Sequence, residues 1–256
     1  MGAKQHLSKK IKVLYNKMDK KGSVTYMQIS NYQDEAYTAI KQMILSMQLT
    51  PGEKVDKYEL STELNIGVTP IREAIIRLSR EGLFDVVPQS GTYVSKINVD
   101  EMNQGRFARV ELEKTIIASA AERMTADQVD ELEQQIALQG VYEHNQDYGH
   151  FFKLDHDFHE LFYIADHKQF VRTWVQQMNL QFIRYRYLQL EINGMHWHHI
   201  IAEHQAIVDA VKAKDTRLAS QMATDHLLAV GKDVKSVLTT YPDYFKSHES
   251  NEPQLT

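Results

Sequence analysis

Residues 49–94 read LTPGEKVDKYELSTELNIGVTPIREAIIRLSREGLFDVVPQSGTYV, and this stretch decides the fold. Asp56 and Glu59 have the spacing of a helix-capping box, which predicts a short helix. Thr69 is a natural N-cap, and Pro70 fits the first position of a further helix, where a missing N–H is harmless. Two short helices joined by a tight turn are typical of a helix-turn-helix.

The flanks of this helix pair complete a winged domain. Upstream, apolar residues between Ala36 and Met47 recur on one helical face. Downstream, two β-prone runs at residues 84–87 and 92–95 enclose the turn Pro-Gln-Ser-Gly, which predicts a hairpin. The sequence therefore predicts a winged helix-turn-helix, a DNA-binding domain, over residues 31–97.

The second helix of a helix-turn-helix enters the major groove, so its first turn must carry residues that reach base edges. Arg72 lies there, and a guanidinium pairs bidentately with guanine. Thr69 is placed to contact a phosphate through its hydroxyl or through the helix N-terminus. The alternative for Arg72 is a surface ion pair, for example with Glu73.

Charge is distributed unevenly along the 256 residues. The net charge of −5 argues weakly against a nucleic-acid binder, but residues 1–30 hold seven lysines and one aspartate. A basic N-terminal part followed by an acidic C-terminal part fits a DNA-binding N-terminal domain and a second domain that does not contact the DNA phosphates. We expect residues 1–30 to be a disordered basic arm, with a phosphate-contacting extension as the alternative.

Composition excludes several classes of protein. The chain has no cysteine, so disulfides and thiolate metal sites are ruled out. No apolar run reaches transmembrane length. The N-terminus lacks the apolar core of a signal peptide, so we expect a cytoplasmic protein.

From residue 98 onward the pattern is helical throughout, and it predicts a mainly α protein. We expect the winged helix-turn-helix to be followed by an all-α bundle of six or seven helices over residues 98–241, and then by a polar tail over 242–256. The pattern places the helices at residues 100–123, 126–145, 148–165, 168–192, 196–213 and 216–238.

Four side chains of the kinds that bind metals lie on apolar stripes of these helices. Asp155 and His159 are four residues apart on one helix, and His204 and His226 lie on two later helices. Burying such groups is unfavourable unless they are paired or bound to a metal. One carboxylate and three imidazoles suit a divalent transition metal, zinc or nickel above all, with an open position. Hydrogen-bonded core residues are the alternative.

Residues 33–95 resemble the GntR family of bacterial regulators. The shared features are the Pro-Gly turn, a leucine-anchored helix, the TPIREA recognition helix, the EGL end and the P-x-x-G wing. Gly67-Val68 departs from the Ser/Thr-Arg pair that the family usually has there, so the family's typical operator is not assumed. The DNA contacts that we expect on this basis are Thr69, Arg72, Arg77, Ser90, Gly91 and Thr92.

Residues 100–235 resemble the effector domain of the FadR branch of that family, known as FCD. The motifs are RVELE at 109–113, LDHDFH at 154–159, EHQAI at 203–207 and DHL at 225–227. Six helices suggest the shorter VanR-like subgroup, and the full ligand set makes an acyl-CoA effector unexpected. In metal-containing members, the ion is held by the residues that match Asp155, His159, His204 and His226.

The resemblance also implies what the second domain senses. A small carboxylate would occupy the open metal position, and Arg109 would neutralise it through a charge-assisted pair. The alternative for Arg109 is an ion pair with Glu113. Arg184 and Arg186 are further candidates for the effector site.

The whole pattern indicates a ligand-responsive transcriptional repressor that binds palindromic double-stranded DNA as a homodimer. A metal-sensing regulator is one alternative. A metal-dependent all-α hydrolase is another, suggested by His156-Asp157, although these two residues lie off the apolar stripe. We do not expect an enzyme.

Overall fold

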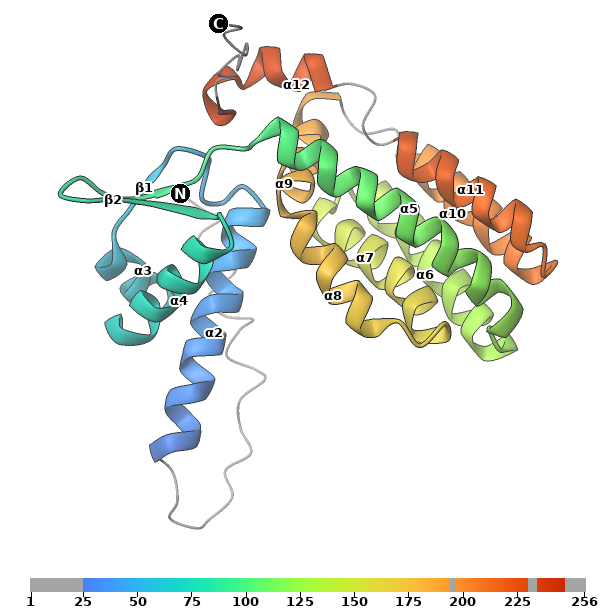
Figure 1. Ribbon diagram of the computed structural model, residues 1–256, viewed down its shortest axis with the longest axis horizontal. Helices are drawn as coiled ribbons and strands as arrows, with labels where there is room; N and C mark the ends of the chain where they lie inside the picture. Colours follow the sequence, from blue (N-terminus) through green and yellow to red (C-terminus); the bar gives the residue numbers. More distant parts are fainter. Residues whose placement is uncertain (1–24, 194–196, 230–233, 247–256) are drawn as a thin grey trace, which may run out of the picture.

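The computed structural model describes residues 25–193, 197–229 and 234–246. A winged domain and a helical bundle lie side by side, and α2 (Thr25–Leu45) packs against α4 while its N-terminal end projects away from both domains (Figure 1). The predicted basic arm lies outside the described residues as far as residue 24. Its last residues, 25–30, begin α2, so the prediction of a disordered arm is wrong for that part.

The first domain has the predicted winged helix-turn-helix order. Asp56 caps α3 by accepting hydrogen bonds from the backbone N–H groups of Tyr58 and Glu59. The strands form an antiparallel sheet in the order β1-β3-β2. The elements that follow α2 are β1 (Lys54–Val55), α3 (Lys57–Leu64), α4 (Val68–Arg80), β2 (Phe84–Val87) and β3 (Gly91–Val94).

The recognition helix α4 begins two residues earlier than predicted. Gly67 occupies the N-cap position, and no side chain caps this end. The prediction that Thr69 is the N-cap is therefore wrong. Pro70 still falls within the first turn, where backbone N–H groups have no partner inside the helix, so its missing N–H is tolerated.

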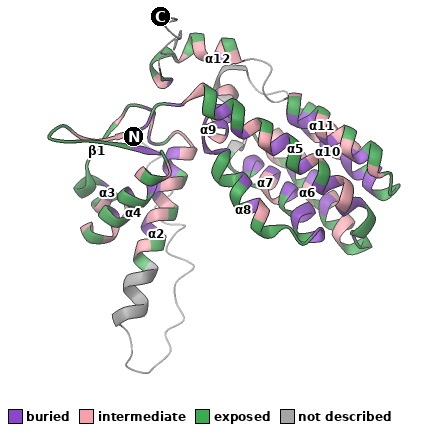
Figure 2. Ribbon diagram, in the orientation of Figure 1, coloured by how far each residue is buried: buried purple, intermediate pink, exposed green. Residues whose placement is uncertain are grey.

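The second domain is built from seven helices among the described residues. The inward faces of all of them except α9 meet in one apolar core, and the outward faces are exposed (Figure 2). The helices are α5 (Val99–Arg123), α6 (Ala126–His144), α7 (Tyr148–Ala165), α8 (Gln169–Met178), α9 (Leu180–Asn193), α10 (Trp197–Lys212) and α11 (Thr216–Ala229).

The single helix predicted over residues 168–192 is wrong, because the chain breaks at Asn179 between α8 and α9. Both the backbone N–H and the side-chain amide of Asn179 donate to the carbonyl oxygen of Val175. A side chain that competes for a backbone carbonyl disfavours helix continuation. The break lies against Gly105 of α5, where any side chain would collide with the carbonyl oxygen of Met178.

Helix α9 connects the two domains. Its first residue, Leu180, is buried in the core of the winged domain together with Ile40 and Leu78. Farther along, Phe182 and Tyr185 pack on Ile97 of the interdomain linker. One helix therefore contributes to the packing of both domains, and Figure 1 shows it at their junction.

The C-terminal end returns to the linker. The predicted helix over 216–238 corresponds to α11 and to α12 (Val234–Thr240), which flank residues outside the described ranges. The short 3-10 helix η2 (Pro242–Tyr244) follows, and the backbone of Ile97 hydrogen bonds with Tyr244 and Lys246. The polar tail predicted from residue 242 is therefore packed as far as residue 246, and 247–256 lie outside the described residues.

Candidate metal centre and DNA-binding surface

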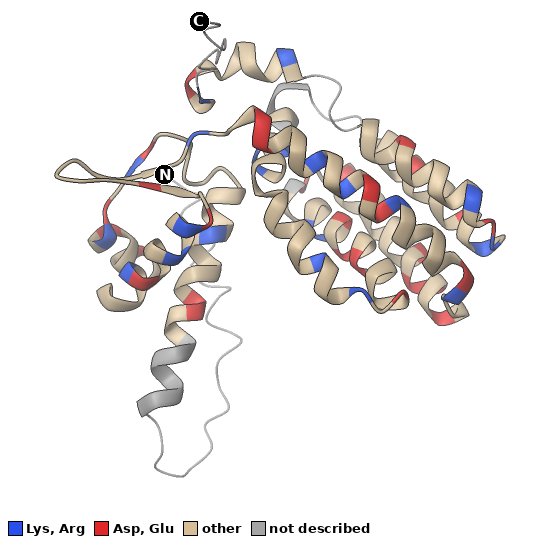
Figure 3. Ribbon diagram, in the orientation of Figure 1, with Lys and Arg blue, Asp and Glu red and all other residues tan. Residues whose placement is uncertain are grey.

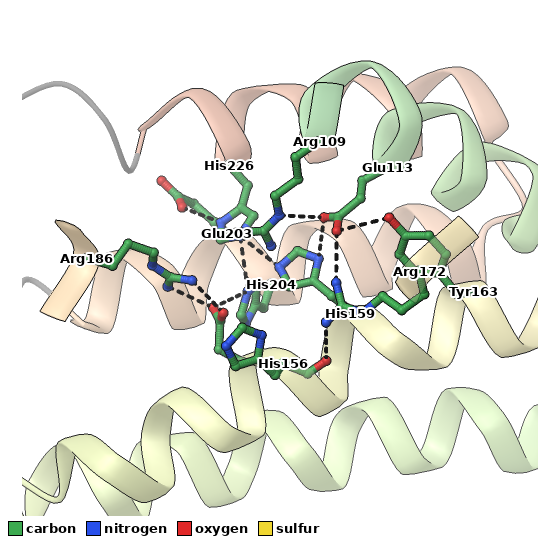
Figure 4. A network of polar contacts seen from close by, with 11 residues as sticks. Arg109, Glu113, His156, His159, Tyr163, Arg172, Arg186, Glu203, His204 and His226 are labelled. Atoms are coloured by element: carbon green, nitrogen blue, oxygen red, sulfur yellow. Dashed lines mark hydrogen bonds and ion pairs between the residues drawn. The ribbon is translucent and has the colours of Figure 1, made fainter. Parts of the chain in front are cut away.

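Three helices bring the four predicted metal ligands together. Asp155 and His159 lie one turn apart on α7, His204 lies on α10, and His226 lies on α11. All four side chains are buried, and their ligand atoms lie within 4.8 Å of one another. Figure 4 shows the three imidazoles converging from these helices.

The imidazoles turn the same ring nitrogen inward. The Nε2 atom of His226 lies 3.3 Å from the Nε2 atom of His159 and 3.3 Å from that of His204. An Asp155 carboxylate oxygen lies 3.7 Å from the Nε2 atom of His204. The centre thus gathers three ring nitrogens and one carboxylate.

Each imidazole is held from outside by an acceptor on its Nδ1 atom. The acceptors are Glu113 for His159 at 3.1 Å, Gln139 for His204 at 2.9 Å and Glu203 for His226 at 2.8 Å. An acceptor at Nδ1 favours the tautomer that carries its proton there, which leaves the Nε2 lone pair free to bind a metal. Sequence reasoning did not assign this role to any of the three residues.

The electrostatics of the centre keep the ligands in their metal-binding forms. Burial lowers the pKa of His159 to about 4, and burial together with His226 lowers the pKa of His204 well below its usual value. Burial acts to raise the pKa of Asp155, but the Arg186 guanidinium outweighs it and holds that pKa well below the ordinary value. The result is neutral imidazoles at His159 and His204 beside the ionised carboxylate of Asp155.

These residues fit a divalent transition metal. Three Nε2 lone pairs aimed at one another repel unless a cation lies between them. Nitrogen and carboxylate ligands without a thiolate suit zinc or nickel. A cation at the centre would replace this repulsion with coordination, so the donor set matches the expected metal.

A second layer of buried charge surrounds Glu113. Its carboxylate pairs with Arg109 at 3.2 Å and with Arg172 at 3.2 Å, and it accepts a hydrogen bond from Tyr163. Burial acts to raise the pKa of Glu113, but Arg109, His159 and Arg172 outweigh it and lower the pKa. The ion pair between Arg109 and Glu113 that the sequence suggested as an alternative is therefore present. Glu113 in turn lies beside His159.

The three arginines predicted for the effector site have separate positions. Arg109 lies beside Glu113, and Arg186 donates to both oxygens of Asp155, at 2.8 and 3.2 Å. Arg184 is fully buried elsewhere and donates to the carbonyl oxygen of Ser95 at 2.5 Å and to its hydroxyl at 3.3 Å. Arg184 therefore lies away from the metal centre, because positions two apart on α9 point the two guanidinium groups to different neighbours.

The His156-Asp157 pair does not join the metal centre. Burial lowers the pKa of His156 to about 3, and its backbone carbonyl accepts a hydrogen bond from Arg172. Asp157 pairs with Lys153 on the outer side of α7. The metal-binding group found among the described residues includes neither of them, so the arrangement expected of a hydrolase is not assembled.

The predicted DNA contacts on α4 separate into two groups. Thr69 and Arg72 are exposed in the first turns of the helix. Arg77 instead stacks on the ring of Tyr37, 3.7 Å from its centroid, and pairs with Asp34 at 3.1 Å. Because both partners lie on α2, Arg77 is directed away from Thr69 and Arg72.

The wing tip lies between β2 and β3. Ser90 is exposed and its hydroxyl lies 2.7 Å from that of Tyr93, while Gly91 takes a positive φ of 141° that favours glycine. Thr92 is half-buried in β3. Lys54 of β1, which sequence reasoning missed, lies against Gly91 and adds a positive charge at the wing.

Comparisons with known proteins match both domains. Family models match residues 32–94, as bacterial regulatory proteins of the gntR family, and residues 106–229, as an FCD domain. An HTH-type transcriptional regulator from an unstable DNA locus of Streptomyces ambofaciens is 30% identical over 220 residues, which cover 86% of this chain and 92% of that protein. The chain belongs to the GntR family.

Other GntR-type proteins give the same result. The HTH-type transcriptional repressor RspR of Escherichia coli K12 is 26% identical over 82% of this chain and 92% of its own length. Among solved structures, McbR/YncC of E. coli superposes with a TM-score of 0.70 at 19% identity, covering 82% of this chain and 98% of that one. A GntR regulator from Rhodococcus sp. RHA1 gives 0.66 at 15% identity, covering 82% and 99%. At such identities the two structures support the fold alone.

The GntR-family protein is thus a transcription regulator rather than an enzyme, with a DNA-binding helix-turn-helix and an FCD domain. The predicted family and fold class are confirmed. None of the described helices has the length and apolar character needed to span a membrane.

Proposed function

We propose that this GntR-family regulator is a repressor whose FCD domain holds a divalent metal, zinc or nickel, and senses a small organic acid. The observation that carries the proposal is the buried group of Asp155, His159, His204 and His226. Each of its imidazoles presents Nε2 inward while its Nδ1 meets an outer acceptor. A bound metal would supply a Lewis-acidic position for a carboxylate.

Arg109 is the residue that we assign to the acid. It is buried beside the centre, and the negative charges of Glu113 and Asp155 favour its charged form. A buried guanidinium at this place provides the charge that an anionic ligand requires. Arg186 has a different role, because its two terminal guanidinium nitrogens already donate to the carboxylate of Asp155.

Helix α9 provides a route from the metal centre to the DNA-binding domain. Arg186 binds the ligand Asp155, and two positions earlier Arg184 binds Ser95. The Ser95 hydroxyl in turn donates to the carbonyl oxygen of Gly82, just past the end of α4, at 2.5 Å. A ligand that shifts Asp155 would therefore also shift α9. Through Arg184 and Ser95, this movement would reach the end of the recognition helix α4.

For DNA we assign Thr69 and Arg72 to the major groove, and Ser90, Gly91 and Thr92 with Lys54 to the wing. A homodimer on a palindromic double-stranded operator would place two such surfaces on adjacent half-sites. The name of the relative RspR supports repression. Binding of chromosomal DNA places the protein in the cytoplasm.

The decisive experiment compares the purified wild-type protein with the His159→Ala/His204→Ala double variant. Elemental analysis is expected to find about one metal per chain in the wild type and none in the variant. A panel of small carboxylic acids should raise the melting temperature of the metal-loaded wild type only. Equal stability of two metal-free proteins would refute the metal-assisted site.

A titration with zinc or nickel, followed by DNA affinity, separates this proposal from metal sensing. An acid sensor keeps its metal and responds to the acid. A metal sensor changes its DNA affinity with the concentration of the metal itself.

A further inference from the structure

A cavity of about 730 Å³ lies between the winged domain and the helical domain. It is bounded by the C-terminal end of α4, the first turns of α5 and the break between α8 and α9. None of the four metal-binding residues lines it, nor does any acceptor that holds their imidazoles. Its size and its position between domains are typical of small-molecule sites. We call it the interdomain cavity.

The charged groups of the interdomain cavity are negative. Its lining includes two carboxylates, Glu81 and Glu101, and four carboxamides, but no lysine or arginine. Figure 3 shows acidic residues at the first turn of α5, where Glu101 lies. Lys41 pairs with Glu81 at 2.6 Å, whereas the described residues include no ion-pair partner for Glu101. A carboxylate without a cation disfavours an anionic ligand and favours a cationic one.

Gln181 adds a buried polar group that lacks a partner. The residue is only 6% exposed and it lines the interdomain cavity. Its side-chain oxygen accepts a hydrogen bond from Arg184 at 3.2 Å, but its amide nitrogen has no acceptor among the described residues. Because a buried donor without an acceptor is unfavourable, this nitrogen calls for an oxygen on the molecule that fills the cavity.

The apolar part of the lining indicates an organic ligand. Phe107 of α5 is 69% exposed and Met178 of α8 is 41% exposed, and both line the cavity. The face of an aromatic ring attracts an organic cation. Calcium and magnesium ions need a shell of oxygen ligands, which a ring and a thioether do not offer. The lining therefore suits a cation that carries its own carbon skeleton.

We propose that the interdomain cavity binds a small organic amine in its protonated form. The ammonium group pairs with Glu101, the carbon skeleton packs on Phe107 and Met178, and an oxygen of the ligand accepts from Gln181. Glu81, which directly follows α4, lines the same cavity, so the ligand contacts the end of the recognition helix and the effector domain together. The site goes beyond the proposed function, because it takes a cation and shares no residue with the metal centre.

The test uses benzylamine as the probe and benzyl alcohol as its uncharged counterpart. Saturation-transfer NMR titrations of the full-length protein measure both dissociation constants. Benzylamine is expected to bind saturably with a Kd of about 1 mM, which is reasonable for a ligand of its size. Benzyl alcohol should bind at least about fivefold more weakly, because it lacks the charge that pairs with the carboxylate.

Two carboxylates of α5 provide the matched variants. Glu101→Gln removes the charge but keeps the oxygen that accepts from Asn98, and it should weaken benzylamine binding about fivefold. Glu111→Gln removes an exposed charge that pairs with Lys114 and lies outside the cavity lining, so it should bind like the wild type. Circular dichroism checks that both variants are folded.

A second pair of variants tests the aromatic wall. Phe107→Leu should weaken benzylamine binding about two- to fivefold, because the attraction between the ring and the cation is lost. Phe170→Leu is the control, since Phe170 is 75% exposed on α8 and does not line the cavity.

Three results would overturn the amine site: equal affinities for benzylamine and benzyl alcohol, wild-type affinity in Glu101→Gln, or loss of benzylamine binding in the His159→Ala/His204→Ala variant. The last result would place the amine on the metal centre. If no acid stabilises the metal-loaded protein while benzylamine still binds, the proposed function fails and the amine site remains.

Discussion

Gln139 shows at the level of one residue how the metal centre depends on groups that are not ligands. Its side-chain oxygen lies 2.9 Å from the Nδ1 atom of His204, and the residue is completely buried. Without this acceptor the imidazole has no preferred tautomer, and its Nε2 lone pair is no longer kept free for the metal.

We therefore expect Gln139→Leu to weaken metal binding by about 10–100-fold while the protein stays folded. The measurement is competition with a metal-binding indicator dye. Gln135→Leu, one turn earlier on α6, is the control, because Gln135 makes no contact with the three histidines. Equal affinities of the two variants would show that the acceptor has no part in metal binding.

Two arginines of α4 have different expected roles on DNA. Replacing Arg72 by alanine should reduce the affinity for the operator by about 1–3 kcal/mol, because an exposed guanidinium in the first turn is placed to read a base. Arg77→Ala should change it far less, since Arg77 is engaged with Asp34 and Tyr37 on α2. Fluorescence anisotropy with labelled DNA measures both, and a larger loss for Arg77→Ala would reverse our assignment.

The sequence predicted that Asp155, His159, His204 and His226 come together, because each lies on an apolar stripe of its own helix. It did not assign Glu113, Gln139 and Glu203 as acceptors, because an acceptor is defined by a neighbour on another helix. The contact of Arg184 with Ser95 was not predicted, for a similar reason. Neighbouring positions on α9 reach different domains, and no periodicity in the sequence shows where a second domain will pack.

At the level of elements, the break between α8 and α9 packs closely against a single glycine. Gly105 of α5 lies so near the carbonyl oxygen of Met178 that a β-carbon would collide with it. Because the carbonyl group of Met178 belongs to the backbone, it cannot move aside as a flexible side chain would. The break occurs at Asn179, and no proline or glycine marks it in the sequence. The pattern therefore predicted one continuous helix over residues 168–192.

Gly105→Ala is accordingly expected to lower the free energy of unfolding by about 1–3 kcal/mol, as overpacking does. Gly140→Ala is the matched control, because a β-carbon at this position of α6 meets nothing within 4 Å. It should stabilise the protein by about 0.5–1 kcal/mol through helix propensity. Urea denaturation compares the two variants, and equal effects would disprove the close approach at Gly105.

At the level of the whole molecule, α9 packs against both the FCD domain and the DNA-binding domain, and we propose that the two domains are coupled through it. Arg184 is the point at which this helix holds the linker, through the carbonyl oxygen and the hydroxyl of Ser95. Burial lowers the pKa of Arg184 to about 10, so the group remains charged at neutral pH. Its removal leaves a buried carbonyl without this donor.

Arg184→Met should therefore uncouple the domains. Metal content and stabilisation by the acid are expected to persist, while the change in DNA affinity caused by the acid becomes smaller than the 1–3 kcal/mol typical of allosteric coupling. Arg123→Met, which removes a more exposed arginine of α5 that pairs with Asp166, is the control. A full response in Arg184→Met would show that the signal takes another route.

The burial of Leu180 in the winged domain also bears on how such regulators exchange parts. A DNA-binding domain that ends at the linker near Ile97 would lack Leu180, although the side chain of Leu180 is part of its hydrophobic core. Chimaeric proteins that join this DNA-binding domain to another sensor domain would have a cavity at the position of Leu180 unless they also include the first turn of α9. The unit that recombination can move intact is therefore discontinuous in sequence.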